Sequence, residues 1–258
     1  MSAIATIEYL LSQFQPASLA DMDRLKLLNR VDQKYIFRMN DLAAMLEEVK
    51  PHYTILSIND KRLFQYNTLY FDTKGFTSYI DHHNGKPNRF KLRYRRYLDS
   101  GDVFFEIKKK IKGLRTDKHR ITLDEIPEGV GESEKKLMEA CGLPNMQLQP
   151  AMWVNYRRMT LMSKESAERV TIDLNLEFSN EEGNISLDGL VIVEVKQAKA
   201  SRNSPFIECL RERQIRETRI SKYSIAVALL NHHLKNNAFG TKIRKIKHLI
   251  DQQWNQAS

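Results

Sequence analysis

Residues 89–98 read RFKLRYRRYL, and this stretch decides how the chain can fold. Side chains on a β-strand alternate between its two faces, so every second residue belongs to the same face. One face of this segment is basic and ends in a tyrosine: Arg89, Lys91, Arg93, Arg95 and Tyr97. The other face is mostly apolar: Phe90, Leu92, Tyr94, Arg96 and Leu98. The alternation predicts a strand with one basic face and one face that belongs in a core.

The same alternation recurs in residues 31–37, 103–110, 114–123, 168–178 and 190–196. The polar faces of these segments are rich in Lys and Arg, and they also contain isolated carboxylates. In the fourth segment the predicted polar face consists of Arg169, Thr171, Asp173, Asn175 and Glu177. For any one strand, an ordinary antiparallel sheet with a solvated polar face would explain the pattern.

Amphipathic segments on both sides of the strands favour a closed barrel instead. Helices that cover the apolar face from outside would leave the charged face lining the interior. We therefore predict an α+β fold, namely a closed antiparallel β-barrel tunnel with a basic lumen, flanked by helices in the N- and C-terminal regions. We expect residues 1–258 to form one domain, with a core at about 22–235 and a basic helix at 241–256.

The charge of the chain indicates an anionic partner. Its 258 residues include 41 Lys and Arg against 32 Asp and Glu, a formal net charge of +9. A basic lumen is stable only if an anion neutralises it, because unpaired charges removed from water are costly. Arg93 and Arg95 would lie about 7 Å apart on their strand, near the spacing of neighbouring phosphates in a chain. The sequence therefore predicts a polyanion inside the tunnel.

Other features of the composition limit where and how the protein works. Cys141 and Cys209 are too few for a disulfide-rich scaffold or a four-cysteine zinc site. They indicate reduced thiols and a cytoplasmic location. The N-terminus lacks the basic start of a signal peptide, and no apolar run reaches the roughly 18 residues of a membrane helix. We therefore expect no transmembrane segment.

Short motifs from about residue 22 to 235 resemble the VTC (vacuolar transporter chaperone) domain. This domain is the polyphosphate polymerase branch of the triphosphate tunnel metalloenzymes, a CYTH-like superfamily. Each motif alone is common, but together they occur in the family's order. They are RVDQKY at 30–35, LYFD at 69–72, KLRYR at 91–95, EIK at 106–108, YRR at 156–158, RVTID at 169–173, EVK at 194–196 and SKY at 221–223. The resemblance implies an antiparallel β-barrel tunnel, in agreement with the alternation of the strands.

The resemblance also implies roles for individual residues. The catalytic, phosphate-binding residues would be Lys34, Arg93, Arg95, Lys108, Arg158, Arg169 and Lys222. Further substrate-binding candidates on the basic wall are Lys91, Lys118, Arg120 and Lys196. Glu194 would be the metal ligand, although a salt bridge to a tunnel Lys or Arg is the alternative. The carboxylates that orient the basic residues would be Asp32, Glu106 and Asp173.

The function that the resemblance implies is that of a polyphosphate polymerase. Such a phosphotransferase moves the γ-phosphoryl group of a nucleoside triphosphate such as ATP to a polyphosphate chain, with Mn²⁺ or Mg²⁺ as the divalent metal. One alternative is an inorganic triphosphatase of the tunnel family, in which water attacks. The first strand argues against it, because Asp32-x-Lys34 stands where the hydrolytic branch has E-x-E-x-K. Another alternative is a polyphosphate-binding protein without catalysis.

Other motifs give weaker signals. No nucleic-acid partner is expected, because the aromatic residues mostly lie opposite the basic ones and not beside them. The pairs His82-His83 and His232-His233 are not expected to bind zinc, since the first falls in a polar turn and adjacent helical residues diverge. No G-x-x-x-x-G-K-[ST] motif of a P-loop occurs.

Overall fold

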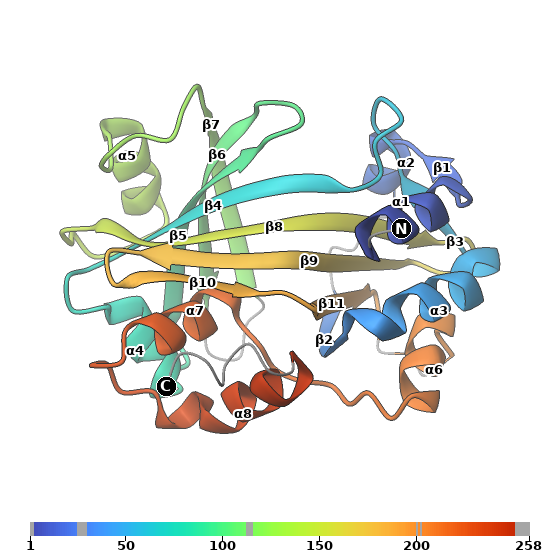
Figure 1. Cartoon of the computed structure of the whole chain (residues 1–258). Helices are drawn as coiled ribbons and strands as arrows, with labels where there is room; N and C mark the ends of the chain where they lie inside the picture. Colours follow the sequence, from blue (N-terminus) through green and yellow to red (C-terminus); the bar gives the residue numbers. More distant parts are fainter. Residues whose placement is uncertain (1–2, 25–29, 112–115, 200, 202, 251–258) are drawn as a thin grey trace.

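The computed structural model describes residues 3–24, 30–111, 116–199, 201 and 203–250. The long strands are β2 (Val31–Arg38), β4 (Phe64–Asp72), β5 (Arg89–Tyr97), β6 (Val103–Lys110), β7 (Thr116–Leu123), β8 (Gln149–Ser163), β9 (Glu168–Asn180) and β11 (Leu190–Gln197). They form one antiparallel sheet in the order β2-β11-β9-β8-β4-β5-β6-β7 (Figure 1). Short strands extend it: β1 (Gln15–Ala17), which is parallel to β3 (Tyr53–Leu56), and β10 (Gly183–Leu187), which pairs with β9.

The sheet curls until its two ends face each other. Lys108 on β6 interacts electrostatically with Lys34 on β2 and Glu194 on β11, although these strands lie far apart in the strand order. We call the side that carries these three residues the inner face. The α+β class and the antiparallel sheet are confirmed. The predicted closure of the barrel is not, because β2 and β7 end the sheet and no strand pairing joins them within the described residues.

Two groups of helices cover the outer face, as the amphipathic segments predict. The helices α1 (Ala3–Ser12), α3 (Met39–Val49) and α6 (Pro205–Glu212) pack on the apolar side of β2, β9 and β11. Helix α6 begins where the Ser204 side chain accepts a hydrogen bond from the Ile207 N–H, with proline in the first turn. Helix α5 (Glu132–Ala140) packs on β4, β5 and β6. The apolar faces are thus buried, and the charged face is left on the inside.

Other helices fill one end of the inner face. They are α4 (Thr77–His83), α7 (Lys222–Leu230) and α8 (Gly240–Leu249), with the short 3-10 helix η2 (Asn237–Phe239). Helix α7 is buried from Tyr223 to Leu229, as expected for a helix that is apolar on every side. It packs against Val154 of β8 and Phe178 of β9. The basic helix predicted at 241–256 corresponds to α8, and residues 251–258 lie outside the described residues.

The remaining short elements complete the chain. Helix α2 (Leu19–Arg24) follows β1, and the 3-10 helix η1 (Lys50–His52) follows α3. No helix within the described ranges is long and apolar enough to cross a membrane.

Cys141 and Cys209 are free and buried, and burial raises the pKa of both thiols, to about 12 for Cys209. Neither side chain is therefore a reactive thiolate at neutral pH.

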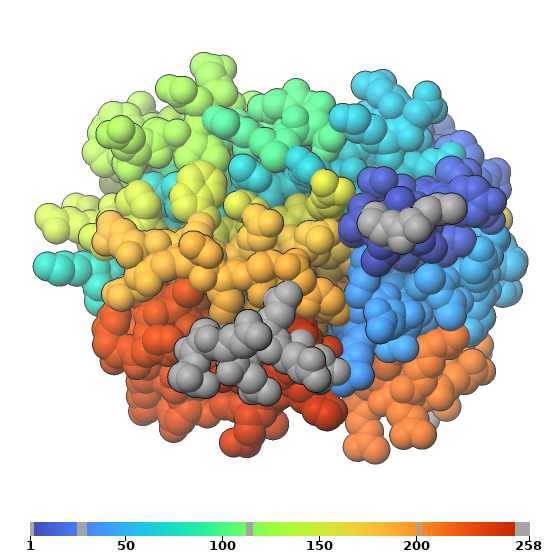
Figure 2. Space-filling view, in the orientation of Figure 1, coloured from blue at the N-terminus to red at the C-terminus, as the bar shows by residue number. Residues whose placement is uncertain are grey.

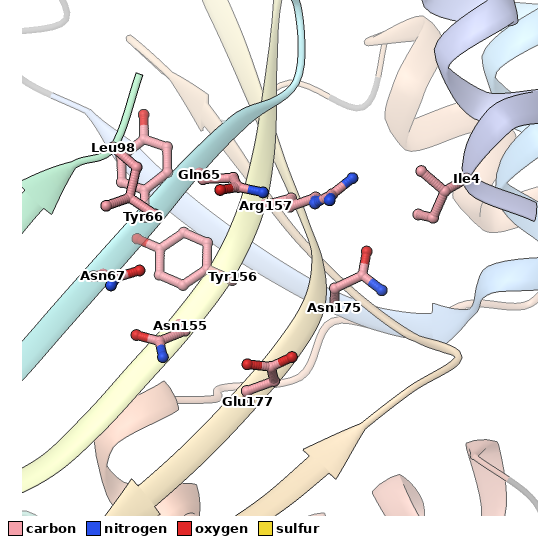
Figure 3. A pocket seen from close by; sticks show the side chains of 10 residues that line it. All are labelled: Ile4, Gln65, Tyr66, Asn67, Leu98, Asn155, Tyr156, Arg157, Asn175 and Glu177. Atoms are coloured by element: carbon pink, nitrogen blue, oxygen red, sulfur yellow. The ribbon is translucent and has the colours of Figure 1, made fainter. Parts of the chain in front are cut away.

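The alternation predicted for residues 168–178 breaks at Asn175. This residue has a φ of 48°, and β9 here contains one residue more than β8, which makes a bulge. The prediction that Asn175 and Glu177 share the basic inner face is therefore wrong. Both line a surface pocket of about 390 Å³ with Asn155 on the outer face (Figure 3). Figure 2 shows the same side, where β8 and β9 (yellow and orange) reach the surface beside α1 (dark blue).

Asp72 at the end of β4 holds α4 and α7 in place. Its buried carboxylate accepts hydrogen bonds from the Tyr223 hydroxyl at 2.5 Å and from the N–H groups of Ser78 and Tyr79 at 2.9 and 3.1 Å. Burial raises the pKa of Asp72 even though these donors oppose the shift. The carboxylate therefore depends on its donors for stability in this position.

We expect Tyr223→Phe to lower the free energy of unfolding by about 1–3 kcal/mol, because it removes the hydroxyl donor and keeps the packed ring. Urea unfolding at neutral pH measures the effect. Tyr9→Phe is the matched control, since the Tyr9 side chain is exposed and should tolerate the same change. Equal stability of the two variants would contradict the anchoring role of Asp72.

Candidate functional site

Glu106 of β6 neutralises basic residues on both neighbouring strands. The residue is 1% exposed, and Arg93 Nε donates to its Oε2 at 2.6 Å. Arg95 lies 3.7 Å from the same oxygen, and Lys118 of β7 forms an ion pair with Oε1. Burial opposes the charge of Glu106, but these cations outweigh it and hold the pKa well below its usual range. The carboxylate therefore stays ionised and fixes the two arginines.

Asp173 of β9 neutralises a second group. Its two oxygens accept from Arg158 Nε at 2.6 Å and from the second guanidinium nitrogen at 2.9 Å. The same carboxylate forms an ion pair with Lys222, the first residue of α7. Burial opposes ionisation here too, but the two cations lower the pKa of Asp173 to about 2. Of the two adjacent arginines, Arg158 points to the inner face, and Arg157 lies 3.8 Å from Glu8.

Glu194 of β11 forms the third group. Lys34, its cross-strand partner on β2, lies at 3.0 Å, and Lys196 lies at 2.9 Å. Both cations outweigh the effect of burial and hold the pKa of Glu194 well below its usual range. Glu194 therefore forms the salt bridges that were the alternative to its role as a metal ligand, and its carboxylate stays ionised.

Several inner-face cations form no ion pair with a carboxylate among the described residues. Lys91 donates to the Ser221 hydroxyl at 2.6 Å, and burial together with Lys108 lowers its pKa well below the usual value. Lys108 is exposed to solvent, yet the protein around it and the opposing Lys34 lower its pKa as well. The buried Nε of Arg169 has no hydrogen-bond partner in the part of the chain that the structure describes. The inner face thus holds positive charge that its own carboxylates do not neutralise.

Tyrosine rings form the floor under these cations. The rings of Tyr66 and Tyr156 stack with their centroids 5.1 Å apart, and the Arg158 guanidinium lies 5.2 Å from each. The Tyr70 hydroxyl accepts from Arg93 at 3.1 Å. Cation–π contact positions a guanidinium and leaves its charge available. This floor is not among the features predicted from the sequence, although the alternation in residues 64–71 places Tyr66 and Tyr70 on one face.

The structure brings the predicted site residues together. The three groups and the unpaired cations contain Lys34, Lys91, Arg93, Arg95, Lys108, Lys118, Arg158, Arg169, Lys196 and Lys222. Arg120 lies opposite Glu106 in the sheet, with its guanidinium 4.6 Å from the Phe104 ring. Asp32 pairs with Arg30 at 2.9 Å at the start of β2. Their roles toward a ligand remain predictions.

Comparison with known families matches residues 29–231 to the VTC domain. The chain belongs to the VTC domain family. The resemblance carried by the ordered motifs is therefore confirmed over most of the chain. Comparison with curated proteins by sequence gave no match.

The VTC domain of this chain is similar in fold to several solved structures. One is a Hippeastrum protein described as a candidate adenylyl cyclase with a dominant triphosphatase activity, at 13% identity and a TM-score of 0.51, over 77% of this chain and 95% of that chain. A candidate adenylate cyclase from Bacillus halodurans has 14% identity and a TM-score of 0.49, over 75% and 94%. One from Vibrio parahaemolyticus has 14% and 0.44, over 78% and 98%. At 13% identity, the likeness to the Hippeastrum protein shows a shared fold.

The inner face of the VTC domain offers two carboxylates that could share a divalent metal with phosphate oxygens. Mg²⁺ at phosphate sites is usually held by one or two carboxylates together with phosphate oxygens. Glu194 and Asp32 both act electrostatically on Lys108, so they lie in one region of the inner face. No group of three or more His, Cys, Asp or Glu that could hold a metal occurs in the described part of the chain. Glu194 and Asp32 alone would therefore be an incomplete set of ligands for a metal.

The histidine pairs lie away from these carboxylates. His82 Nδ1 is 2.6 Å from the Ser224 hydroxyl, and His83 Nε2 is 2.8 Å from Asn237 Oδ1. His233 lies 3.8 Å from Glu182 in the turn between β9 and β10. Among the described residues, neither pair forms a hydrogen bond or ion pair with Glu194 or Asp32.

We expect Glu106→Gln to destabilise the VTC domain by about 3 kcal/mol, because it leaves Arg93 and Arg95 without their counter-charge. Tripolyphosphate should restore much of the lost thermal stability, since it supplies negative charge to the same region. Thermal unfolding with and without tripolyphosphate measures both effects. Glu125→Gln, at an exposed position, is the control. If Glu106→Gln unfolds like this control, the neutralising role is wrong.

Proposed function

We propose that this protein transfers phosphoryl groups on a linear polyphosphate held along the inner face, as a polyphosphate polymerase does. The observation that carries the proposal is a set of cations that form no ion pair with a carboxylate among the described residues: Lys91, Lys108 and Arg169. Cations that are partly removed from water without an ion-pair partner lower the stability of the protein, and a bound anion would offset this cost. A linear phosphate chain is the anion whose spaced charges match cations repeated along strands. We also propose that the curled sheet encloses this chain as a tunnel.

The geometry suits phosphoryl transfer, which depends on positioning and on stabilisation of charge. Arg93, Arg95 and Arg158 present planar forks that their carboxylates and tyrosines hold in place. Lys34 and Lys108 face each other from opposite ends of the sheet and would approach the transferred group from two sides. Glu194 and Asp32 would hold a Mg²⁺ or Mn²⁺ ion, which supplies Lewis-acid stabilisation of phosphate oxygens when bound.

A tunnel triphosphatase is the second candidate. It is favoured by the shared fold with the Hippeastrum protein, which is described as having a dominant triphosphatase activity. The two reactions use the same cations and differ in the attacking group, which is water or the end of a phosphate chain. The single carboxylate of Asp32-x-Lys34 on β2 offers less activation of water than a carboxylate pair would.

The decisive experiment incubates the purified protein with ATP and Mn²⁺ and separates the phosphate products by gel. We expect polyphosphate chains to grow. Release of orthophosphate from tripolyphosphate without chain growth would replace the polymerase by the triphosphatase. Tight binding of polyphosphate with neither reaction would show a binding protein.

Two variants should separate metal binding from phosphate binding. Glu194→Gln should abolish metal-dependent turnover and keep affinity for polyphosphate within about threefold in the absence of metal, because it removes a metal ligand and keeps the cations. Arg93→Ala should weaken both, by roughly tenfold or more in affinity, because it removes a charged fork. The two measurements are polyphosphate formation with Mn²⁺ and the affinity for polyphosphate without metal, each made for both variants. Polymer formation by Glu194→Gln at the parent rate would refute the metal assignment.

Binding of polyphosphate should take up protons above pH 8. Burial lowers the pKa of Lys118 and of Lys196 to about 8, so both are partly neutral at pH 8.5. A bound polyanion favours their charged forms and raises both pKa values, so protons enter on binding and affinity falls as the pH rises. Calorimetry at pH 8.5 in buffers of different ionisation enthalpy counts the protons. The double variant Lys118→Arg/Lys196→Arg stays charged at this pH, so it should take up fewer protons on binding than the parent protein. Equal proton uptake by the two proteins would show that Lys118 and Lys196 are not the groups that titrate.

A further inference from the structure

Like charges face each other at one end of the β5–β6 hairpin. In the register of these strands, Lys91 lies opposite Lys108, and two residues further along Arg89 lies opposite Lys110. Like charges directly opposite each other destabilise an antiparallel pair. The hairpin therefore carries two successive unfavourable pairs on its inner face, and both would gain from a shared anion.

The cluster of cations continues beyond the sheet. His82 on α4 interacts electrostatically with Lys91, Arg89, Lys110 and Lys242 of α8, so side chains from the sheet and from two helices gather around it. Burial and these cations lower the pKa of His82 to about 3, and the imidazole is neutral at physiological pH. We call Arg89, Lys110 and Lys242 the basic mouth.

No carboxylate neutralises the basic mouth in the ranges that the structure describes. Arg89 donates to the backbone carbonyl of Lys86 at 2.7 Å, and Lys242 Nζ lies 5.4 Å from the Phe239 ring centroid. Arg89 and Lys242 are partly exposed and Lys110 is exposed, so a large anion can reach all three. The mouth is thus an accessible surface of positive charge that adjoins the site.

The mouth continues the row of cations on the inner face. Along β5 the row contains Arg95, Arg93, Lys91 and Arg89, and it spans about 20 Å at the rise of a strand. Glu106 balances its inner part, whereas its outer part is balanced by nothing in the described residues. The turn at the opposite end of the hairpin carries Asp99 and Asp102. An anionic chain that extends beyond the inner face is therefore attracted to the end with the mouth.

From this continuity, and resting on the proposed function, we infer that the basic mouth binds the part of a polyphosphate chain that extends beyond the inner face. The substrate class is then a long linear polyphosphate and not a triphosphate alone. A triphosphate would be held within the inner face and would not reach Lys110 or Lys242. The mouth is a binding surface, and the groups that act on the transferred phosphoryl lie deeper inside.

The test compares affinities for two phosphate chains of different length. Tripolyphosphate and a polyphosphate of several tens of units are titrated without metal at one ionic strength into three proteins. These are the parent chain, Lys110→Gln/Lys242→Gln, and the control Lys135→Gln/Lys136→Gln, which removes equal charge from exposed positions on α5. We expect the mouth variant to lose at least about fivefold in affinity for the long chain and less than twofold for tripolyphosphate. The control should keep both affinities within twofold.

The outcomes separate the inference from the function on which it rests. The inference about the basic mouth would be overturned by an equal loss of affinity for both phosphate chains, by no loss for either, or by the same loss in the control variant. A single-stranded oligonucleotide of equal charge that binds the parent more tightly than polyphosphate would overturn it as well. A parent protein that binds neither phosphate chain would refute the proposed function itself. Thermal unfolding of the variants without ligand shows that each is folded.

Discussion

Positive charge gathered on the inner face is the constraint on which the rest of the structure depends. Strands β2, β5, β6, β7, β8, β9 and β11 all turn basic side chains to this side, and three carboxylates form ion pairs with most of them. Those carboxylates stay ionised because the cations around Glu106, Asp173 and Glu194 outweigh the cost of burial. The outer helices are needed for the same reason, since they cover the apolar faces and leave the charged face inside.

The sequence predicts this arrangement correctly where side chains alternate between the two faces of a strand, and incorrectly where the alternation is interrupted. Residues 89–98 alternate regularly, and their apolar side chains Leu92 and Tyr94 are buried under α5 as expected. At Asn175 the extra residue of β9 changes which side chains point inward, and Leu176 and Phe178 then pack against α7. A bulge depends on how β9 pairs with β8, so the pattern of β9 alone cannot reveal it.

The site was predictable as a set of residues but not as a set of contacts. The ordered motifs identify the basic residues of the inner face, yet the partners of Glu106 and Glu194 follow from strand register. Register depends on turns and packing across the whole sheet, and a single strand does not encode it. Lys222 and Asp173 lie 49 residues apart in the chain, so their contact depends on how α7 packs against the sheet. The predicted closure of the barrel, which the strand pairing does not confirm, depends on the sheet edges and likewise lies beyond a strand's own pattern.

Asp173 holds Arg158 and Lys222 in the fold, and it would also moderate the proposed binding of phosphate to them. Lys222 stands at the start of α7, where the helix dipole disfavours a cation, and the carboxylate offsets that cost. A phosphate that binds Arg158 and Lys222 must compete with Asp173 for them, so its net affinity is the difference between two strong interactions. In the proposed function, a phosphate chain that moves along the inner face would require such moderated contacts, because a site that bound phosphate with its full charge would not let the product advance. The carboxylates would then set the strength of binding as well as the stability of the empty fold.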